Sequence, residues 1–231
     1  MILPIYLAMT RLQMEKFSTD TEKRAFMSCH FSTSGYGLSN LPGNLPENTM
    51  LILDDSTPVS DHDKNLIADT ILKLAPECVL LDFQKKPHPE ARNMVKELLQ
   101  ALPCPVGVSA AYAEGLACPV FLPPVPPWIP LQEHISPWNG RDIWLELSTD
   151  AALAEITQDG TQFHYAENAP EGPPVFHSDT LHCHYCGSEK EDRVEYYLWR
   201  TADDCRQLAE NAAQYGVKAA VGVYQQFYLH A

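Results

Sequence analysis

The sequence has few basic residues: 16 lysines and arginines stand against 30 aspartates and glutamates in 231 residues, a formal net charge of -14. Phosphate backbones and anionic membrane surfaces repel such a chain, so neither nucleic acid nor a membrane is an expected partner. No segment approaches the roughly 20 apolar residues that span a bilayer. The start of the chain also lacks a basic leader, and we therefore expect no signal peptide and a cytoplasmic location.

Several other familiar patterns are missing. The seven cysteines are odd in number and scattered, which favours small buried thiols in a reducing compartment over a disulfide framework. No repeat of solenoid period is visible. The glycine-containing segments at residues 34–37 and 107–109 are too short for a phosphate-cradling loop or a nucleophile elbow.

Eight apolar segments have the character of β-strands. They are residues 2–9, 25–32, 49–55, 77–84, 104–110, 118–122, 142–148 and 217–224. Apolar residues recur at helical spacing between the third and fourth strands and again from Pro89 to Leu102, and a further helix is expected to begin at Thr201. Strands alternating with helices pair in parallel, which predicts an α/β fold, a (β/α)8 TIM-like barrel, as one domain over residues 1–231.

The predicted barrel is irregular. Residues 33–48 and 123–140 are expected to cross over as loops, and the chain ends too soon after residue 224 for a closing helix. Within residues 151–200 the alternation predicts antiparallel β-hairpins inserted before the last strand, one turning at Asp159-Gly160 and one through residues 187–190.

The segment from Cys78 to Gln84 is the most informative strand. Alternation directs Leu80, Asp82 and Gln84 to one face and the residues between them to the other, so the strand is apolar until its carboxyl end. Active sites of α/β barrels lie at that end of the strands. An inward carboxylate on an apolar strand also costs stability unless it is paired, which singles out Asp82.

Other polar residues follow the predicted strand ends. Asp54 and Asp55 end the third strand, and Glu146 lies on the seventh. Convergent carboxylates can act as general acid and base once burial separates their pKa values. The alternative is ordinary loop polarity. Aromatic and amide side chains near the same end are candidate ligand contacts: Tyr112, Trp128, Tyr224 and Gln225.

Residues 177–186 contain three histidines and two cysteines. His182 and His184 are expected to share a strand face, and Cys183 and Cys186 have the spacing of a zinc knuckle, so these four are the candidate metal ligands. No second half completes the motif. We therefore predict no cofactor and favour a hairpin at a solvent edge whose histidines stack on Tyr196 or Trp199, with zinc as the alternative.

In the order of its parts the chain resembles glycoside hydrolase family 18, the chitinase-like barrels, which include spore-cortex and cell-wall lytic members. Residues 77–84 match the position of the family's Asp-Gly-x-Asp-x-Asp-x-Glu strand, and a helix and a Pro-Val-x-Val-Ser strand follow. Hairpins before the last strand are also a family feature. The segments 197–204 and 215–224 are similar to the family's closing unit.

The resemblance implies a cleft for sugars, but the motif is incomplete. Gln84 stands where the family has its general acid, Leu80 replaces the middle Asp, and only the Asp82 position is retained. The family's Met-x-Tyr-Asp is also missing, with residues 121–124 in its place. An amide cannot donate and recover a proton, and losing general-acid help typically costs about 10²–10⁴-fold in rate.

Two functions remain open at this point. The first is a degenerate, non-hydrolytic barrel that binds a carbohydrate, a cell-wall fragment, another small polar ligand or a protein. The second is an active hydrolase with relocated chemistry, based either on the carboxylates Asp54, Asp55, Asp82 and Glu146 or on a metal at residues 177–186.

Overall fold

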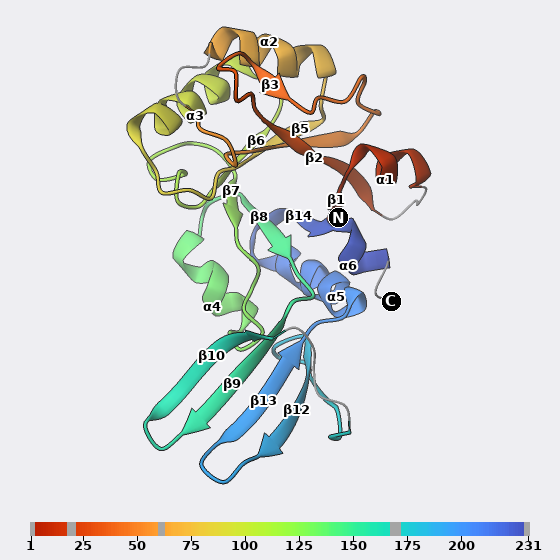
Figure 1. Ribbon diagram of the computed structural model, residues 1–231, viewed down its shortest axis with the longest axis vertical. Helices are drawn as coiled ribbons and strands as arrows, with labels where there is room; N and C mark the ends of the chain where they lie inside the picture. The colour runs from red at the N-terminus through yellow and green to blue at the C-terminus, as the bar shows by residue number, and fades with distance from the viewer. Residues whose placement is uncertain (1–2, 18–21, 60–62, 167–171, 229–231) are drawn as a thin grey trace.

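The computed structural model describes residues 3–17, 22–59, 63–166 and 172–228, and its main body is a closed barrel of eight parallel strands (Figure 1). The strands are β1 (Ile5–Met9), β2 (Lys23–Phe31), β4 (Thr49–Asp54), β5 (Cys78–Asp82), β6 (Val106–Ser109), β7 (Val120–Leu122), β8 (Ile143–Leu147) and β14 (Val217–Val223). β1 pairs with both β2 and β14 and so closes the ring. All eight predicted strands are confirmed, except that residue 2 lies outside the described residues.

The barrel interior is filled by side chains of alternate strand positions. Met50, Ile52, Leu80 and Trp144 belong to this inner cluster. The Trp144 ring lies against the backbone of Gly107, where an added Cβ would come within 2.3 Å of the ring. Glycine at this position therefore makes room for the largest interior side chain.

Helices cover the outside of the barrel. α2 (Lys64–Leu74) begins after Asp63, whose carboxylate accepts hydrogen bonds from two backbone N–H groups of the first turn. α3 (Pro89–Ala101) has Pro89 in its first turn, and α5 (Ala202–Ala212) follows Thr201 as its N-cap. These helices confirm the sequence-based prediction. Their apolar faces pack against the outward-facing side chains of the barrel strands, and we call this layer the outer core.

Three short helices lie where the sequence predicts loops or the end of the fold. Residues 33–48 hold only the two-residue strand β3 (Leu38–Ser39), but residues 123–140 contain α4 (Leu131–Ile135) and a 3-10 helix (Ser136–Trp138). After β14 the chain forms α6 (Tyr224–Tyr228), where we expected no closing helix. Its Phe227 packs against Gly222, at 2.5 Å from where a Cβ would stand, so this glycine allows α6 to pack close to the end of β14. A further short helix, α1 (Arg11–Lys16), follows β1.

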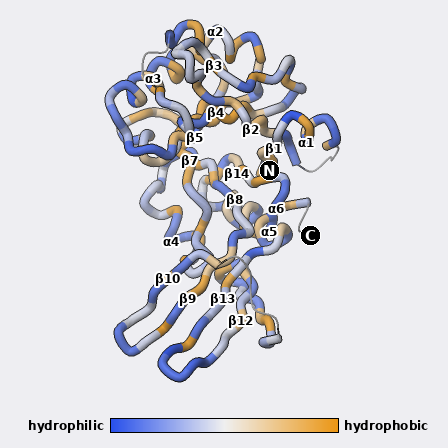
Figure 2. The backbone as a smooth tube through the Cα atoms, viewed as in Figure 1, coloured by the Kyte–Doolittle hydropathy of each residue, from blue (hydrophilic) through white to orange (hydrophobic). Residues whose placement is uncertain are grey.

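The hairpin prediction for residues 151–200 is confirmed. β9 (Ala151–Thr157), β10 (Gly160–Ala166), β11 (Phe176–Ser178), β12 (Cys183–Glu189) and β13 (Val194–Trp199) form one antiparallel sheet, which we call the insertion. It projects away from the barrel, and the outer ends of its strands are largely hydrophilic (Figures 1 and 2). The second hairpin turns at residues 190–193, later than predicted, because β12 continues through residues 187–189.

Arg200 joins the insertion to the barrel. The side chain is 4% exposed, and its guanidinium donates to the carbonyl oxygens of Val125, Leu181 and His182. The insertion is thereby tied to the loop that follows β7. Among the described residues, no helix combines the length and the hydropathy that crossing a membrane requires.

Candidate functional site

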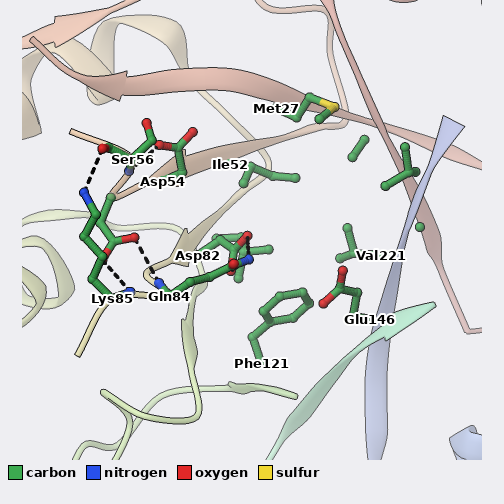
Figure 3. Close-up of a pocket in the computed structure, with 15 residues that line it drawn as sticks. Met27, Ile52, Asp54, Ser56, Asp82, Gln84, Lys85, Phe121, Glu146 and Val221 are labelled. Carbon is green, nitrogen blue, oxygen red and sulfur yellow. Dashed lines mark hydrogen bonds between the residues drawn. The ribbon is translucent and has the colours of Figure 1, made fainter. Parts of the chain in front are cut away.

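Five of the residues singled out from the sequence line one cavity at the carboxyl end of the barrel. Asp54, Asp55, Asp82, Gln84 and Glu146 surround a space of about 500 Å³, which we call the cleft. Its floor is apolar and includes Ile52, Phe121 and Val221 (Figure 3). Leu80 lines the same space. The cleft therefore has the shape expected of a ligand site, with a few polar groups above an apolar base.

The alternation predicted for residues 78–84 is confirmed. Leu80 lies in the inner cluster, and Asp82 and Gln84 line the cleft above it. Val79, Leu81 and Phe83 pack in the outer core. One strand thus carries both an apolar core face and the polar pair that reaches the cleft.

Asp82 is held by two neutral donors. The Gln84 side-chain amide lies 3.2 Å from Oδ2, and the Ser109 hydroxyl lies 3.3 Å from Oδ1. Burial raises the pKa of the Asp82 carboxyl; the two hydrogen bonds oppose this shift, and the charges of Asp54 and Asp55 add to it. The net shift of the pKa is upward, because burial outweighs the two hydrogen bonds.

Asp54 and Asp55 are adjacent in sequence but differ in role. Asp54 stands beside Asp82 in the strand register and accepts a hydrogen bond from the backbone of Ser56. Asp55 is 4% exposed, and its two oxygens accept from the backbone N–H groups of Gln84 and Lys85, each at 3.0 Å. Asp55 therefore positions the loop that presents Gln84 to the cleft.

Glu146 lies on β8 and has the most perturbed carboxyl group of the cleft. Burial raises its pKa to about 7, and the charges of Asp82 and Asp150 contribute to the rise. Among the described lining residues Lys85 alone is basic, and its ammonium donates to the Ser56 carbonyl at 2.7 Å. At neutral pH the cleft thus contains a carboxyl group that is protonated in a large fraction of molecules.

The four predicted ligand contacts lie outside the cleft. Tyr112 is 1% exposed, packs edge-on against Phe83 and donates to the Lys85 carbonyl. Trp128 stacks on Phe163 at 4.2 Å between ring centroids, beside the insertion. Tyr224 and Gln225 belong to α6, where Tyr224 stacks on Tyr228. All four residues follow strands at the carboxyl end of the barrel, and none of them lines the cleft.

The histidine and cysteine segment is arranged differently from the prediction. His182 precedes β12 with a φ of +48°, and its ring lies 3.1 Å from the Asn211 amide. Cys183 and Cys186 are buried thiols. Of the four predicted ligands, only His184 belongs to a group able to hold a metal, and its partners are His177 and Asp204. The predicted stacking of a histidine on Trp199 is present, at His184.

Three contributors to these sites are not predicted from the sequence. They are Ser109 as a donor to Asp82, Asp55 as the anchor of the loop at Gln84 and Lys85, and Asp204 as the partner of the histidines. The spacing Thr201-x-x-Asp204 is that of a capping box, a signal that it would face the start of α5.

No protein-family model and no curated protein sequence matches this chain. Solved structures do. A family 18 chitinase from Cycas revoluta, solved with (GlcNAc)4, superposes with a TM-score of 0.59 at 9% identity over 95% of this chain and 94% of that one. The chain shares the fold of this chitinase.

Two further structures support the assignment of a family 18-like fold. A glycoside hydrolase family 18 N-acetylglucosaminidase from Paenibacillus barengoltzii gives a TM-score of 0.58 at 8% identity, covering 99% of this chain and 97% of its own. The spore cortex-lytic enzyme SleL of Bacillus cereus gives 0.54 at 11% identity, with coverage of 96% and 70%. The expected family 18-like barrel is thus confirmed as a fold.

Proposed function

We propose that the cleft binds a carbohydrate or a cell-wall fragment and does not hydrolyse it. The observation that carries the proposal is the pair formed by Gln84 and Asp82 at the end of β5. In the resemblance described above, Gln84 occupies the position of the general acid. Its amide can donate a hydrogen bond to a sugar, but it cannot deliver a proton.

The chemistry of the cleft suits a sugar. Carboxylates of Asp54 and Asp82 accept hydrogen bonds from hydroxyl or acetamido groups, and the Gln84 amide both donates and accepts. The apolar floor around Phe121 can contact the C–H face of a ring. The solved relatives in fold support this ligand class, because the Cycas revoluta chitinase is solved with GlcNAc oligomers. The cytoplasmic location stays a prediction.

A binding screen tests the proposal. The full chain is applied to an array of chitooligosaccharides, peptidoglycan fragments and unrelated glycans, beside Asp82→Ala and the matched control Asp159→Ala, which removes an exposed aspartate in the β9–β10 turn. We expect one glycan class to be retained by the wild type and Asp159→Ala and released by Asp82→Ala. Absence of binding, or equal binding by both variants, contradicts the proposal.

A second function is favoured by one observation, the pKa of about 7 at Glu146. Protonated Glu146 would act as general acid at a glycosidic oxygen, and Asp82 or Asp54 would act as base or nucleophile. This hydrolase would release reducing ends from chitooligosaccharides, lose activity above about pH 7 and be inactivated by Glu146→Gln. Reducing ends released by the wild type overturn the non-hydrolytic proposal, and their absence across all substrates that bind overturns the hydrolase.

A further inference from the structure

A second group of ionisable side chains lies at the base of the insertion, away from the barrel cleft. His177, His184 and Asp204 line a cavity of about 830 Å³ that also includes Trp199 and Arg206. The Asp204 side chain is only 6% exposed, whereas the two imidazoles are about one-third exposed, at 30% and 32%. The group is therefore anchored on its carboxylate side and accessible from the cavity.

The fold brings these three residues together from distant points in the sequence. β11 and β12 pair antiparallel, and His177 and His184 stand directly opposite each other in the register, with ring centroids 4.9 Å apart. Asp204 lies in the first turn of α5, where its carboxylate accepts hydrogen bonds from the backbone and hydroxyl of Thr201, each at 2.8 Å. Backbone register and a helix cap thus fix the positions of all three side chains.

The distances within the group are those of ligands around one ion. His177 Nε2 lies 3.0 Å from Asp204 Oδ1, His184 Nδ1 lies 2.8 Å from Oδ2, and the three ligand atoms lie within 4.8 Å of one another. Tetrahedral zinc with bonds of about 2.0–2.1 Å separates its ligand atoms by roughly 3.3 Å. The two imidazole–carboxylate distances are close to this separation, and the ligand atoms adjust around the ion when it binds.

The surroundings of His177 also call for a cation. Its Nε2 faces Asp204 and its Nδ1 faces Asp179 Oδ1 at 3.0 Å, so each ring nitrogen meets a carboxylate. A neutral imidazole has one N–H and can donate to only one of them. A doubly protonated ring would satisfy both carboxylates. A metal on Nε2 would satisfy them as well, because Nδ1–H then donates to Asp179 in the carboxylate–histidine–metal arrangement common in metal sites.

We propose that His177 Nε2, His184 Nδ1 and the Asp204 carboxylate bind one divalent transition-metal ion, with zinc as the best match. Oδ1 of Asp204 is the expected ligand atom, since the helix cap already occupies Oδ2. Two imidazoles and one carboxylate form a three-ligand set that leaves the fourth zinc position open, here toward the cavity. The ion links the β11–β12 hairpin to the start of α5, and it replaces the predicted set of His182, His184, Cys183 and Cys186.

The test uses the full chain, stripped with a chelator and titrated with ZnCl₂ by calorimetry and with CoCl₂ by visible absorption. We expect one ion per chain and the absorption bands of tetrahedral cobalt. His177→Ala and His184→Ala should each abolish tight binding, and Asp179→Ala should weaken it by about 10–100-fold. His164→Ala is the matched control, because it removes an exposed histidine of the insertion that pairs with Glu155.

Several results would overturn the site. One is substoichiometric zinc with the wild type; another is equal zinc affinity in the double variant His177→Ala/His184→Ala. Loss of binding in Cys186→Ser but not in His177→Ala would move the ion to the thiols. Circular dichroism of each variant shows whether the insertion is still folded, and the glycan array is read separately, so failure here leaves the cleft proposal intact.

Discussion

The barrel cleft and the histidine cluster of the insertion, formed by His177, His184 and Asp204, shift the pKa of an aspartate in opposite directions. Asp82 in the cleft has two neutral donors and acidic neighbours, and its pKa is raised. Burial alone would also raise the pKa of Asp204, but hydrogen bonds from Thr201, His184 and His177 outweigh it and lower the value. The hydrogen bonds outweigh burial at Asp204 and do not at Asp82, where acidic neighbours add to the rise.

This difference separates two kinds of function. The cleft carboxylates have unused acceptor capacity and repel one another, so stability is lost in the free protein and a ligand with hydroxyl or amide donors can restore it. The Asp204 carboxylate accepts hydrogen bonds from Thr201 at the start of α5 and from the histidines of β11 and β12, so it joins the insertion to that helix. Substitutions that remove charge should consequently have opposite effects at the two sites.

The largest effect is expected for Asp204→Asn. The amide lacks the negative charge that the donors of Thr201, His177 and His184 share, and it presents its own N–H groups to Thr201 or to an imidazole. Breaking charge-assisted hydrogen bonds of this kind costs about 2–4 kcal/mol in the free energy of unfolding. Urea denaturation in the presence of a chelator measures this cost without a contribution from metal.

Asp203→Asn is the matched control, since Asp203 is the preceding residue of the same helix, 86% exposed and paired with Arg206 at 2.9 Å. An exposed pair contributes little, and we expect a loss below about 1 kcal/mol. Equal losses for the two variants would show that Asp204 stabilises the protein only as one more acidic residue at a helix start.

The barrel was predictable from the sequence because each strand is an apolar run bounded by polar residues. On β5 the alternation alone placed Asp82 and Gln84 on the cleft side and Phe83 in the outer core. The position of a strand and the faces of its side chains can be predicted from the residues of that strand alone. Periodicity also identified α2, α3 and α5, whose apolar stripes pack on the outer core.

The histidine cluster was not predictable in the same way. The sequence suggested that His182 and His184 share a face, but His182 adopts a left-handed backbone conformation and leaves the strand. The true partner, His177, is set by the register of a hairpin, and Asp204 comes from a helix 20 positions after His184. Likewise, packing between elements buried Tyr112 and drew Trp128 onto Phe163.

A smaller effect, of the opposite sign, is expected for Glu146→Gln. In the folded protein the Glu146 pKa is about 7, above the ordinary value of 4.5. The folded state then binds more protons than the unfolded state between these values, so stability falls as the pH rises through this window. Glu146→Gln should match the wild type near pH 5 and exceed its stability by about 2 kcal/mol at pH 8, measured by urea denaturation.

Glu114→Gln controls for the change in net charge, because Glu114 is exposed in the turn that follows β6. Its stability relative to the wild type should show no comparable rise between pH 5 and pH 8. A difference between Glu146→Gln and the wild type that stays constant with pH would argue that Glu146 is ionised throughout and that the cleft tolerates its charge.

The smallest effect should come from Asp82→Asn, which tests whether the cleft sacrifices stability for binding. The amide oxygen of asparagine can still accept from the Ser109 hydroxyl, while the buried negative charge beside Asp54 is gone. We expect a gain of up to about 1 kcal/mol in the free energy of unfolding at pH 8, together with loss of glycan binding. A destabilised variant would instead mean that the carboxylate is structural, like Asp204. A more stable variant that no longer binds would show that the unpaired charge of Asp82 is kept for a ligand, and the contrast between the two sites would then be one of function.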